Sequence, residues 1–114
     1  MSFDAWVEKR MQELRTLGAD YAKAKAQVEY IDEFKKTKLA LLMQEAEAKG
    51  HKTAVAQERE ARTHPEYIDL LDSYRAAVEV AEKCRWELKV AEIGVEVWRT
   101  QQANERNERK GYGA

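Results

Sequence analysis

Hydrophobic residues recur every three or four positions along most of this chain, which is the period of an α-helix. The first stripe of such residues begins at Phe3 and ends at Ala46. Gly18 interrupts the stripe, and a glycine inside a helix costs about 1 kcal/mol relative to alanine. We therefore expect one helix over residues 3–17 and a second over residues 20–49, ending where glycine follows.

Two start signals come after this stripe. Thr53 is a good N-cap residue and predicts a short linking helix over residues 54–62. Thr63 is a second cap candidate, with Pro65 in the first turn and Glu66 at the capping-box position. This combination predicts that another helix begins at the proline.

The last predicted helix is long, because only Gly94 interrupts the chain between residues 65 and 109. At 1.5 Å per residue its length is about 68 Å, whereas a compact globule of this size is only about 30–35 Å across. Such a helix must pack against other copies or be broken. Residues 111–114 are expected to form a disordered tail, which leaves residues 1–110 as a single helical domain.

This long helix carries two apolar stripes. The longer stripe comprises Tyr67, Leu71, Tyr74, Val78, Ala81, Cys84, Leu88, Ala91, Val95 and Trp98. The shorter stripe comprises Trp86, Val90, Ile93 and Val97. Leu88 and Val90 are two residues apart, or about 200° around a helix. The two stripes therefore lie on nearly opposite faces.

Opposite faces predict two different contacts. One face can pack on the first helix as an antiparallel hairpin, and the other needs a second partner. That partner is either the N-terminal piece, folding back with Phe3, Trp6 and Val7, or a neighbouring subunit, which we favour because an exposed apolar row is a contact surface. We expect an all-α fold, an antiparallel long-helix hairpin with a short linking helix. It would assemble as a homo-oligomer through coiled-coil-like contacts at Trp86, Val90, Ile93 and Val97.

The composition narrows the fold and the location. The 114 residues include 36% charged residues but only one proline and five glycines, too few breakers for the many turns of a sandwich, a barrel or an α/β fold. A single cysteine cannot form an internal disulfide, which favours a reducing cytoplasm. No apolar run approaches the roughly 20 residues that span a bilayer, and the N-terminus does not resemble a signal peptide. We therefore expect a cytoplasmic protein without membrane contact.

No catalytic constellation is visible in the sequence. His51 and His64 lack ligand partners at metal spacing, and Glu58 and Glu60 lie on different helix faces. We interpret His51 as a loop residue, His64 as a cap or turn residue and Cys84 as a small core residue. The sequence thus predicts a protein that is not an enzyme and that holds no metal or cofactor.

The charges are unevenly distributed although the net charge is only −1. Residues 1–34 carry −2, residues 35–62 carry +3, residues 63–98 carry −4 and residues 99–114 carry +2. Repeated in an oligomer, the basic segment could follow a phosphate backbone, or its charges could simply solvate helix faces. The candidate nucleic-acid contacts are Lys35, Lys36, Lys38, Lys52, Arg59 and Arg62.

The layout also resembles a known family. Its elements are the Lys-rich segment at 35–38 followed by Leu39, Leu41 and Leu42, the linking segment 53–62, the opening Pro65–Glu66–Tyr67, and a final stretch with Trp98, Arg99, Glu105 and Arg106. Over about residues 20–109 the chain is similar to small phage-encoded UvsY-like recombination mediator proteins.

That resemblance implies a helical hairpin that self-assembles, binds single-stranded DNA, contacts a single-strand-binding protein and loads a RecA-like recombinase in the bacterial host cell. Matched by position, DNA contact would fall to Lys35, Lys36, Lys38, Arg59 and Arg62. The alternative is a helical protein–protein interaction module, such as a phage inhibitor or assembly adaptor, without nucleic-acid binding. A scaffolding coiled coil is a third possibility.

Overall fold

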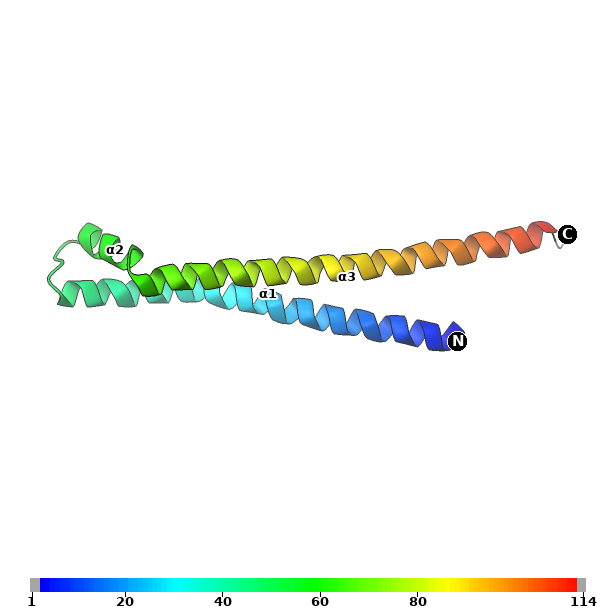
Figure 1. The fold of residues 1–114 in the computed structure, drawn as a ribbon, viewed down its shortest axis with the longest axis horizontal. Helices are drawn as coiled ribbons and strands as arrows, with labels where there is room; N and C mark the ends of the chain where they lie inside the picture. Colours follow the sequence, from blue (N-terminus) through cyan, green and yellow to red (C-terminus); the bar gives the residue numbers. More distant parts are fainter. Residues whose placement is uncertain (1–2, 113–114) are drawn as a thin grey trace. The chain divides into compact units, whose positions relative to one another are not determined.

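The structure, a computed structural model, describes residues 3–112, which form three helices and no strand. Helix α1 spans Phe3–Ala48, α2 spans Ala54–Arg62 and α3 spans Pro65–Tyr112 (Figure 1). The expected all-α class, with two long helices joined by a short linking helix, is therefore confirmed.

Contacts along the helices divide the chain into two compact units. We call Ala22–Glu82 the turn unit, because it holds α2 and both connections. The described residues of Met1–Tyr21 and Lys83–Ala114 form the terminal unit. Each unit contains one segment of α1 and one segment of α3. That residues 1–110 form a single helical domain stays a prediction.

In the turn unit the segments of α1 and α3 run antiparallel. Lys38 of α1 meets Glu66 near the start of α3, with 2.6 Å between the ammonium nitrogen and a carboxylate oxygen. Lys35, about one turn earlier in α1, lies over the ring of Tyr74, farther along α3. Moving back along α1 thus means moving forward along α3, as in the predicted hairpin.

The buried core also belongs to the turn unit. Leu42, Ala61 and Tyr67 form one buried cluster, and Leu39 and Met43 pack against it. Because these three residues come from α1, α2 and α3 respectively, the cluster fixes the linking helix against both long ones. The buried hydrophobic residues among those described are Ala24, Ile31, Leu42, Ala46, Ala61 and Tyr67.

The end of α1 is defined by Gly50, whose φ of 109° lies in the left-handed region that favours glycine. The Gly50 N–H donates to the carbonyl of Glu47, and the His51 N–H donates to the carbonyl of Ala46. This pair of bonds is the Schellman motif, which satisfies carbonyls left without partners at a helix end. Glycine therefore stops α1 as the sequence predicts, one residue before the expected end at residue 49.

The linking helix has the predicted bounds and one unexpected cap. Thr53 caps its start, since the side-chain oxygen accepts the N–H of Ala56. Thr63, expected to cap the start of α3, instead donates its hydroxyl to the carbonyl of Arg59 and caps the end of α2. The cap of α3 is His64, whose Nδ1 accepts the N–H of Glu66 at 3.1 Å. The interpretation of Thr63 with Glu66 as a capping box is therefore wrong, whereas that of His64 as a cap residue is confirmed.

The terminal unit is also antiparallel, but its packing is aromatic. The ring of Trp6 stacks on Trp98 with centroids 4.2 Å apart, and Phe3 lies 5.5 Å from the same ring. The inner side chains Leu88 and Val95 are half-buried. No described residue of this unit is fully buried.

Two expected boundaries need correction. Helix α1 continues through Gly18, so the predicted break there is wrong. Once a helix is formed, extending it past one glycine costs much less than nucleating a second helix. Helix α3 continues past residue 109 to Tyr112, so the expected disordered tail is wrong for Gly111 and Tyr112. The rest of that expected tail, residues 113–114, lies outside the described residues.

Candidate nucleic-acid interface and apolar docking row

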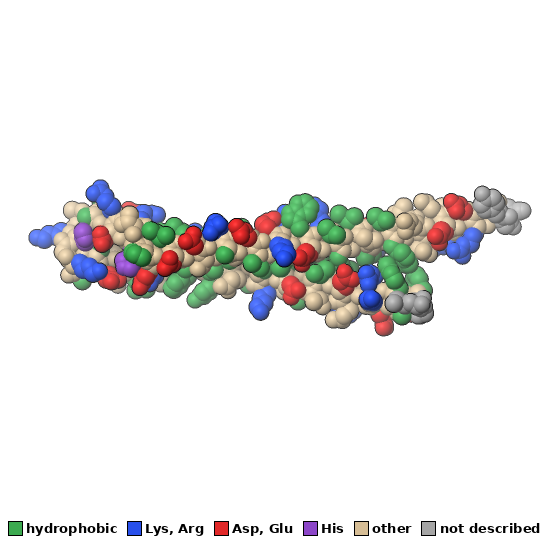
Figure 2. Space-filling model, in the orientation of Figure 1, with side chains coloured by type: hydrophobic (Ala, Val, Ile, Leu, Met, Phe, Trp, Pro, Cys, Tyr) green, Lys and Arg blue, Asp and Glu red, His purple; other side chains and the backbone are tan. Residues whose placement is uncertain are grey.

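All six candidate nucleic-acid contacts lie in the turn unit, and we call them the basic group: Lys35, Lys36, Lys38, Lys52, Arg59 and Arg62. Figure 2 shows basic side chains around the end of this unit that holds α2, with acidic side chains between them. The local field is therefore mixed rather than uniformly positive.

The three lysines on α1 are engaged with other side chains. Lys35 is half-buried, with its ammonium group 4.0 Å from the centre of the Tyr74 ring and 3.2 Å from a carboxylate oxygen of Asp32. Lys36 donates to Glu33 at 3.0 Å. Lys38 joins α1 to α3 through Glu66. Of the three, Lys35 and Lys38 contribute to packing between helices.

The remaining members differ in their neighbours. Arg62 pairs with Glu58 one turn earlier, with 2.9 Å between nitrogen and oxygen. Lys52 and Arg59 are exposed, and among residues 3–112 no carboxylate lies within ion-pair distance of either side chain. The basic group thus offers two unengaged cations, on either side of the start of α2.

These ion pairs shift the protonation equilibria of their members. Hydrogen bonding to Lys38 and its positive charge lower the pKa of Glu66 below its ordinary value. Hydrogen bonding to Glu33 raises the pKa of Lys36, and hydrogen bonding to Glu58 raises the pKa of Arg62. Because these side chains reach solvent, the pairs are screened and each contributes little to stability.

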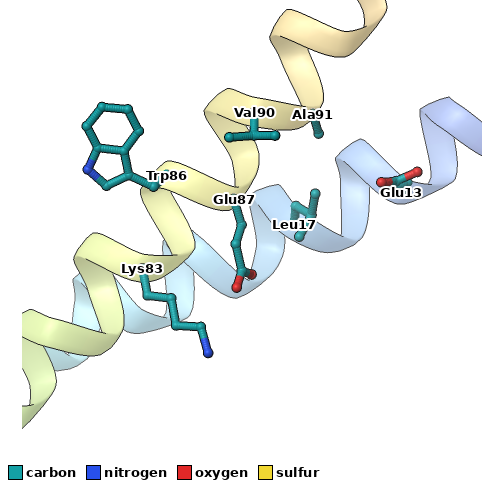
Figure 3. A pocket seen from close by; sticks show the side chains of 7 residues that line it. All are labelled: Glu13, Leu17, Lys83, Trp86, Glu87, Val90 and Ala91. Atoms are coloured by element: carbon teal, nitrogen blue, oxygen red, sulfur yellow. The ribbon is translucent and has the colours of Figure 1, made fainter.

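The shorter apolar stripe of α3 is solvent-exposed, and we call it the outer row: Trp86, Val90, Ile93 and Val97. The exposed fractions of these side chains are 52%, 64%, 51% and 52% respectively. Figure 2 shows hydrophobic side chains gathered along the outer side of α3. Figure 3 shows the indole of Trp86 projecting away from α1, with Val90 about one turn farther along α3. The row is thus a continuous apolar strip that residues 3–112 leave open.

The described part of the N-terminal piece does not cover the outer row. Phe3 and Trp6 pack on Trp98, which belongs to the longer, inner stripe. Sequence reasoning proposed these residues as one possible cover for the row and missed the aromatic cluster. The signal was the three-residue spacing of Phe3 and Trp6, together with the position of Trp98 as the last large residue of the inner stripe.

Polar and charged groups border the outer row. Trp86 and Val90 line an open groove with Leu17 of α1, and Glu87 reaches into this groove (Figure 3). The charged groups of Arg85 and Lys89 lie 5.2 and 5.1 Å from the Trp86 ring centre. Cations at this distance are attracted to an indole face. An apolar strip with a charged border is the composition of a protein-contact surface.

The histidines and the cysteine occupy ordinary structural positions. His51 follows the end of α1, its carbonyl accepts from the Gln57 side chain, and its Nε2 lies 3.8 Å from Glu60. Cys84 is half-buried. Within residues 3–112 no group of three or more His, Cys, Asp and Glu side chains could hold a metal ion. None of the described helices is long and apolar enough to cross a membrane.

No protein-family model, curated protein or solved structure matches this chain. The basic group and the outer row are therefore the features that bear on function.

Proposed function

We propose that this protein is a non-catalytic helical interaction module that works by docking the outer row of α3 on another protein surface. The observation that carries the proposal is the exposure of four neighbouring apolar side chains, each more than half open to water. Single exposed hydrophobic residues are common on protein surfaces, whereas a continuous apolar strip marks a contact site.

The energetics favour docking. Burying a side chain such as valine or isoleucine releases about 1.5–3 kcal/mol relative to full exposure, and the outer row already exposes only about half of each side chain. Four such side chains together could therefore contribute several kcal/mol to an association. Trp86 has the additional property of an indole anchor, the residue type most enriched at interaction hot spots.

A double charge substitution in the outer row tests the proposal. Trp86→Glu with Ile93→Glu places two carboxylates in the row, at side chains that are about half exposed. The matched control is Val55→Glu with Ile68→Glu, two exposed apolar side chains in the turn unit. Circular dichroism of both variants checks that the helices remain.

The measurements are the native mass of the purified protein and the stoichiometric proteins that co-purify with it. We expect the outer-row variant to lose an assembled state or a stoichiometric partner that the control variant keeps. If the two variants behave alike in both measurements, the outer row is not a docking surface and the proposal fails.

A second candidate function is the binding of single-stranded DNA during recombination, which the resemblance to UvsY-like mediators implies. The observation that favours it is the pair of exposed cations at Lys52 and Arg59, which have no carboxylate partner among residues 3–112. Lys36 and Arg62 could join them, because an exposed ion pair is worth only about 0–1 kcal/mol and a phosphate can displace its carboxylate.

Fluorescence anisotropy with a labelled single-stranded oligonucleotide tests this second function. We expect binding at about 50 mM salt that falls steeply as salt rises, because each neutralised phosphate releases counterions. Lys52→Glu with Arg59→Glu should weaken binding by about tenfold or more, whereas Lys23→Glu with Lys25→Glu makes the same charge change on α1 and should weaken it less. Undetectable binding at low salt, or equal losses in both variants, rules this function out.

A further inference from the structure

The spacing of the outer-row residues indicates what kind of element packs on the row. Trp86, Val90, Ile93 and Val97 follow one another at intervals of four, three and four residues. This is the alternation of the two seam positions in a coiled-coil heptad, the pattern with which one helix packs along another. The occupant of the row is therefore expected to be a helix.

We propose that this helix is α3 of a second copy of the chain, packed antiparallel against the outer row about a two-fold axis. The inference rests on the proposed function, because it names the partner of the same surface. In a two-fold contact each side presents the same patch, so the row must be complementary to itself. Its side-chain sizes and its flanking charges both meet this requirement.

Side-chain size fits an antiparallel register. With Val90 opposite Ile93 of the second copy, Trp86 falls opposite Val97 of that copy, and the two-fold axis repeats both layers. Each layer then pairs a larger side chain with a smaller one, which lets the layers interdigitate. A parallel register would instead place the two indoles of Trp86 directly opposite each other.

Charge gives the stronger argument. Lys89 and Glu96 are exposed and immediately precede Val90 and Val97, so both flank the seam on the same side. In the antiparallel register Lys89 lies beside Glu96 of the second copy, with about 3 Å of offset along the axis. The two-fold axis forms this opposite-charge pair twice. In a parallel register the same residues would lie beside Gly94 and Gln101 of the second copy, and no such pair would form.

The present contacts of these two residues do not oppose the arrangement. Lys89 lies over the ring of Trp86, and Glu96 pairs with Arg99 at 3.1 Å. Both contacts are local to one exposed helix face, where such pairs are weak and readily exchanged. Phe3 and Trp6 are already packed on Trp98 and leave the row open.

Sedimentation of charge-reversed variants tests the pairing. Lys89→Glu alone and Glu96→Lys alone each turn two attractive pairs into repulsive ones, and we expect each to weaken the dimer about tenfold. The double variant Lys89→Glu with Glu96→Lys should restore the wild-type dissociation constant. Glu92→Lys makes the same change in net charge as Glu96→Lys at an exposed residue outside the row, and should leave the dimer unchanged.

Orientation is tested by the distance between spin labels. In a Cys84→Ala background, Asn104→Cys places one label on exposed residue 104 of each copy. The antiparallel register separates the two labels by about 40 Å, mostly along the helix axis, whereas a parallel register brings them within about 15 Å. The shorter distance overturns the proposal.

A further outcome separates this inference from the proposed function. A wild-type chain that stays monomeric up to several hundred micromolar overturns the antiparallel dimer. The proposed function survives that result if a stoichiometric partner protein is lost with Trp86→Glu and Ile93→Glu. A dimer that the double charge reversal does not restore also overturns the assigned register.

Discussion

The turn unit and the terminal unit each contain a segment of α1 and a segment of α3, but they bury the apolar side chains of these helices differently. In the turn unit, α1, α2 and α3 meet around Leu42, Ala61 and Tyr67, and every fully buried hydrophobic residue described belongs to this unit. In the terminal unit only two helices pack, through half-buried side chains and the aromatic contacts of Trp6 and Trp98. One unit has its own core, whereas the other has an apolar face left open.

The difference between the units shows that a third helix lets a hairpin bury a core that two helices leave partly exposed. Two helices can shelter only the facing stripe of each, and any second apolar stripe stays in water. The nine residues of α2 are enough to close the core at one end. No such element covers the terminal unit among the described residues, and the outer row lies in this unit. Stability and interaction are thus expected to be concentrated in different units.

The largest expected effect is the loss of the turn-unit core. Leu42 is 3% exposed and its neighbour Leu41 is 51% exposed, so the pair allows the same substitution in two environments. Leu42→Ala should lower the free energy of unfolding by about 2–5 kcal/mol through lost burial and a residual cavity, whereas Leu41→Ala should change it by less than about 1 kcal/mol. Urea denaturation followed by circular dichroism measures both. Equal losses would mean that the turn unit has no distinct core.

A smaller and more local effect is expected in the terminal unit. Trp98→Ala removes the ring that contacts both Phe3 and Trp6. Because Trp98 is only half-buried, the loss should be about 2 kcal/mol, below the 3–5 kcal/mol of a fully buried tryptophan. Hydrogen exchange should become faster in residues 3–14 and 91–105.

The same experiment contains its own control. Amides around Leu42 and Tyr67 should keep their protection in the Trp98→Ala variant, since the turn-unit core is intact. Trp86→Ala, measured at high dilution, should leave both units protected because that side chain is half exposed in a single chain. Faster exchange throughout the chain after Trp98→Ala would show that the two units open together.

The sequence predicts the helices well and their contacts less well. The hydrophobic period and the signals at Gly50, Thr53 and Pro65 are local, and they place the end of α1, both ends of α2 and the start of α3 to within one residue. The continuity of α1 through Gly18 is not local, because one unfavourable residue is outweighed by the cooperativity of a long helix. Thr63 caps the end of α2 and His64 caps the start of α3, because the two helices follow one another so closely. The capping propensity of a single residue does not predict this arrangement.

The candidate sites show the same division. The exposed face of the outer row follows from the 200° separation of the two stripes, which periodicity alone provides. The engagement of the basic group does not follow from counting charges. Lys36 and Arg62 pair with carboxylates on their own helices, whereas Lys38 pairs with Glu66 only because α1 and α3 are antiparallel. Counting the net charge of each segment therefore overestimates the number of basic side chains without a carboxylate partner.

Replacing glycine by alanine should change the free energy of unfolding in opposite directions in the two units. Gly50 in the turn unit has a φ of 109°, and Gly50→Ala should destabilise by about 1 kcal/mol because a Cβ is disfavoured in the left-handed region. Gly94 lies inside α3 in the terminal unit, where a Cβ would meet nothing within 4 Å. Gly94→Ala should therefore stabilise by about 0.5–1 kcal/mol through its higher helix propensity. Urea midpoints measure both, and a loss at residue 94 would indicate that a neighbour needs that space.

The smallest expected effect is the pH response of the ion pair between Lys38 and Glu66, which ties α1 to α3 in the turn unit. The pKa of Glu66 is lower in the folded chain than in the unfolded chain, because only the folded chain holds the carboxylate against Lys38. The unfolded chain therefore takes up the proton first as the pH falls. The stabilisation is complete above the ordinary glutamate pKa and is lost as the pH falls through the lowered value. The difference in Tm between wild type and Glu66→Gln should thus shrink toward zero over this acidic range.

Glu29→Gln is the control, since Glu29 is exposed and has no ion-pair partner among residues 3–112. A difference for Glu66→Gln that stays constant with pH would mean that the pair does not link the helices in solution.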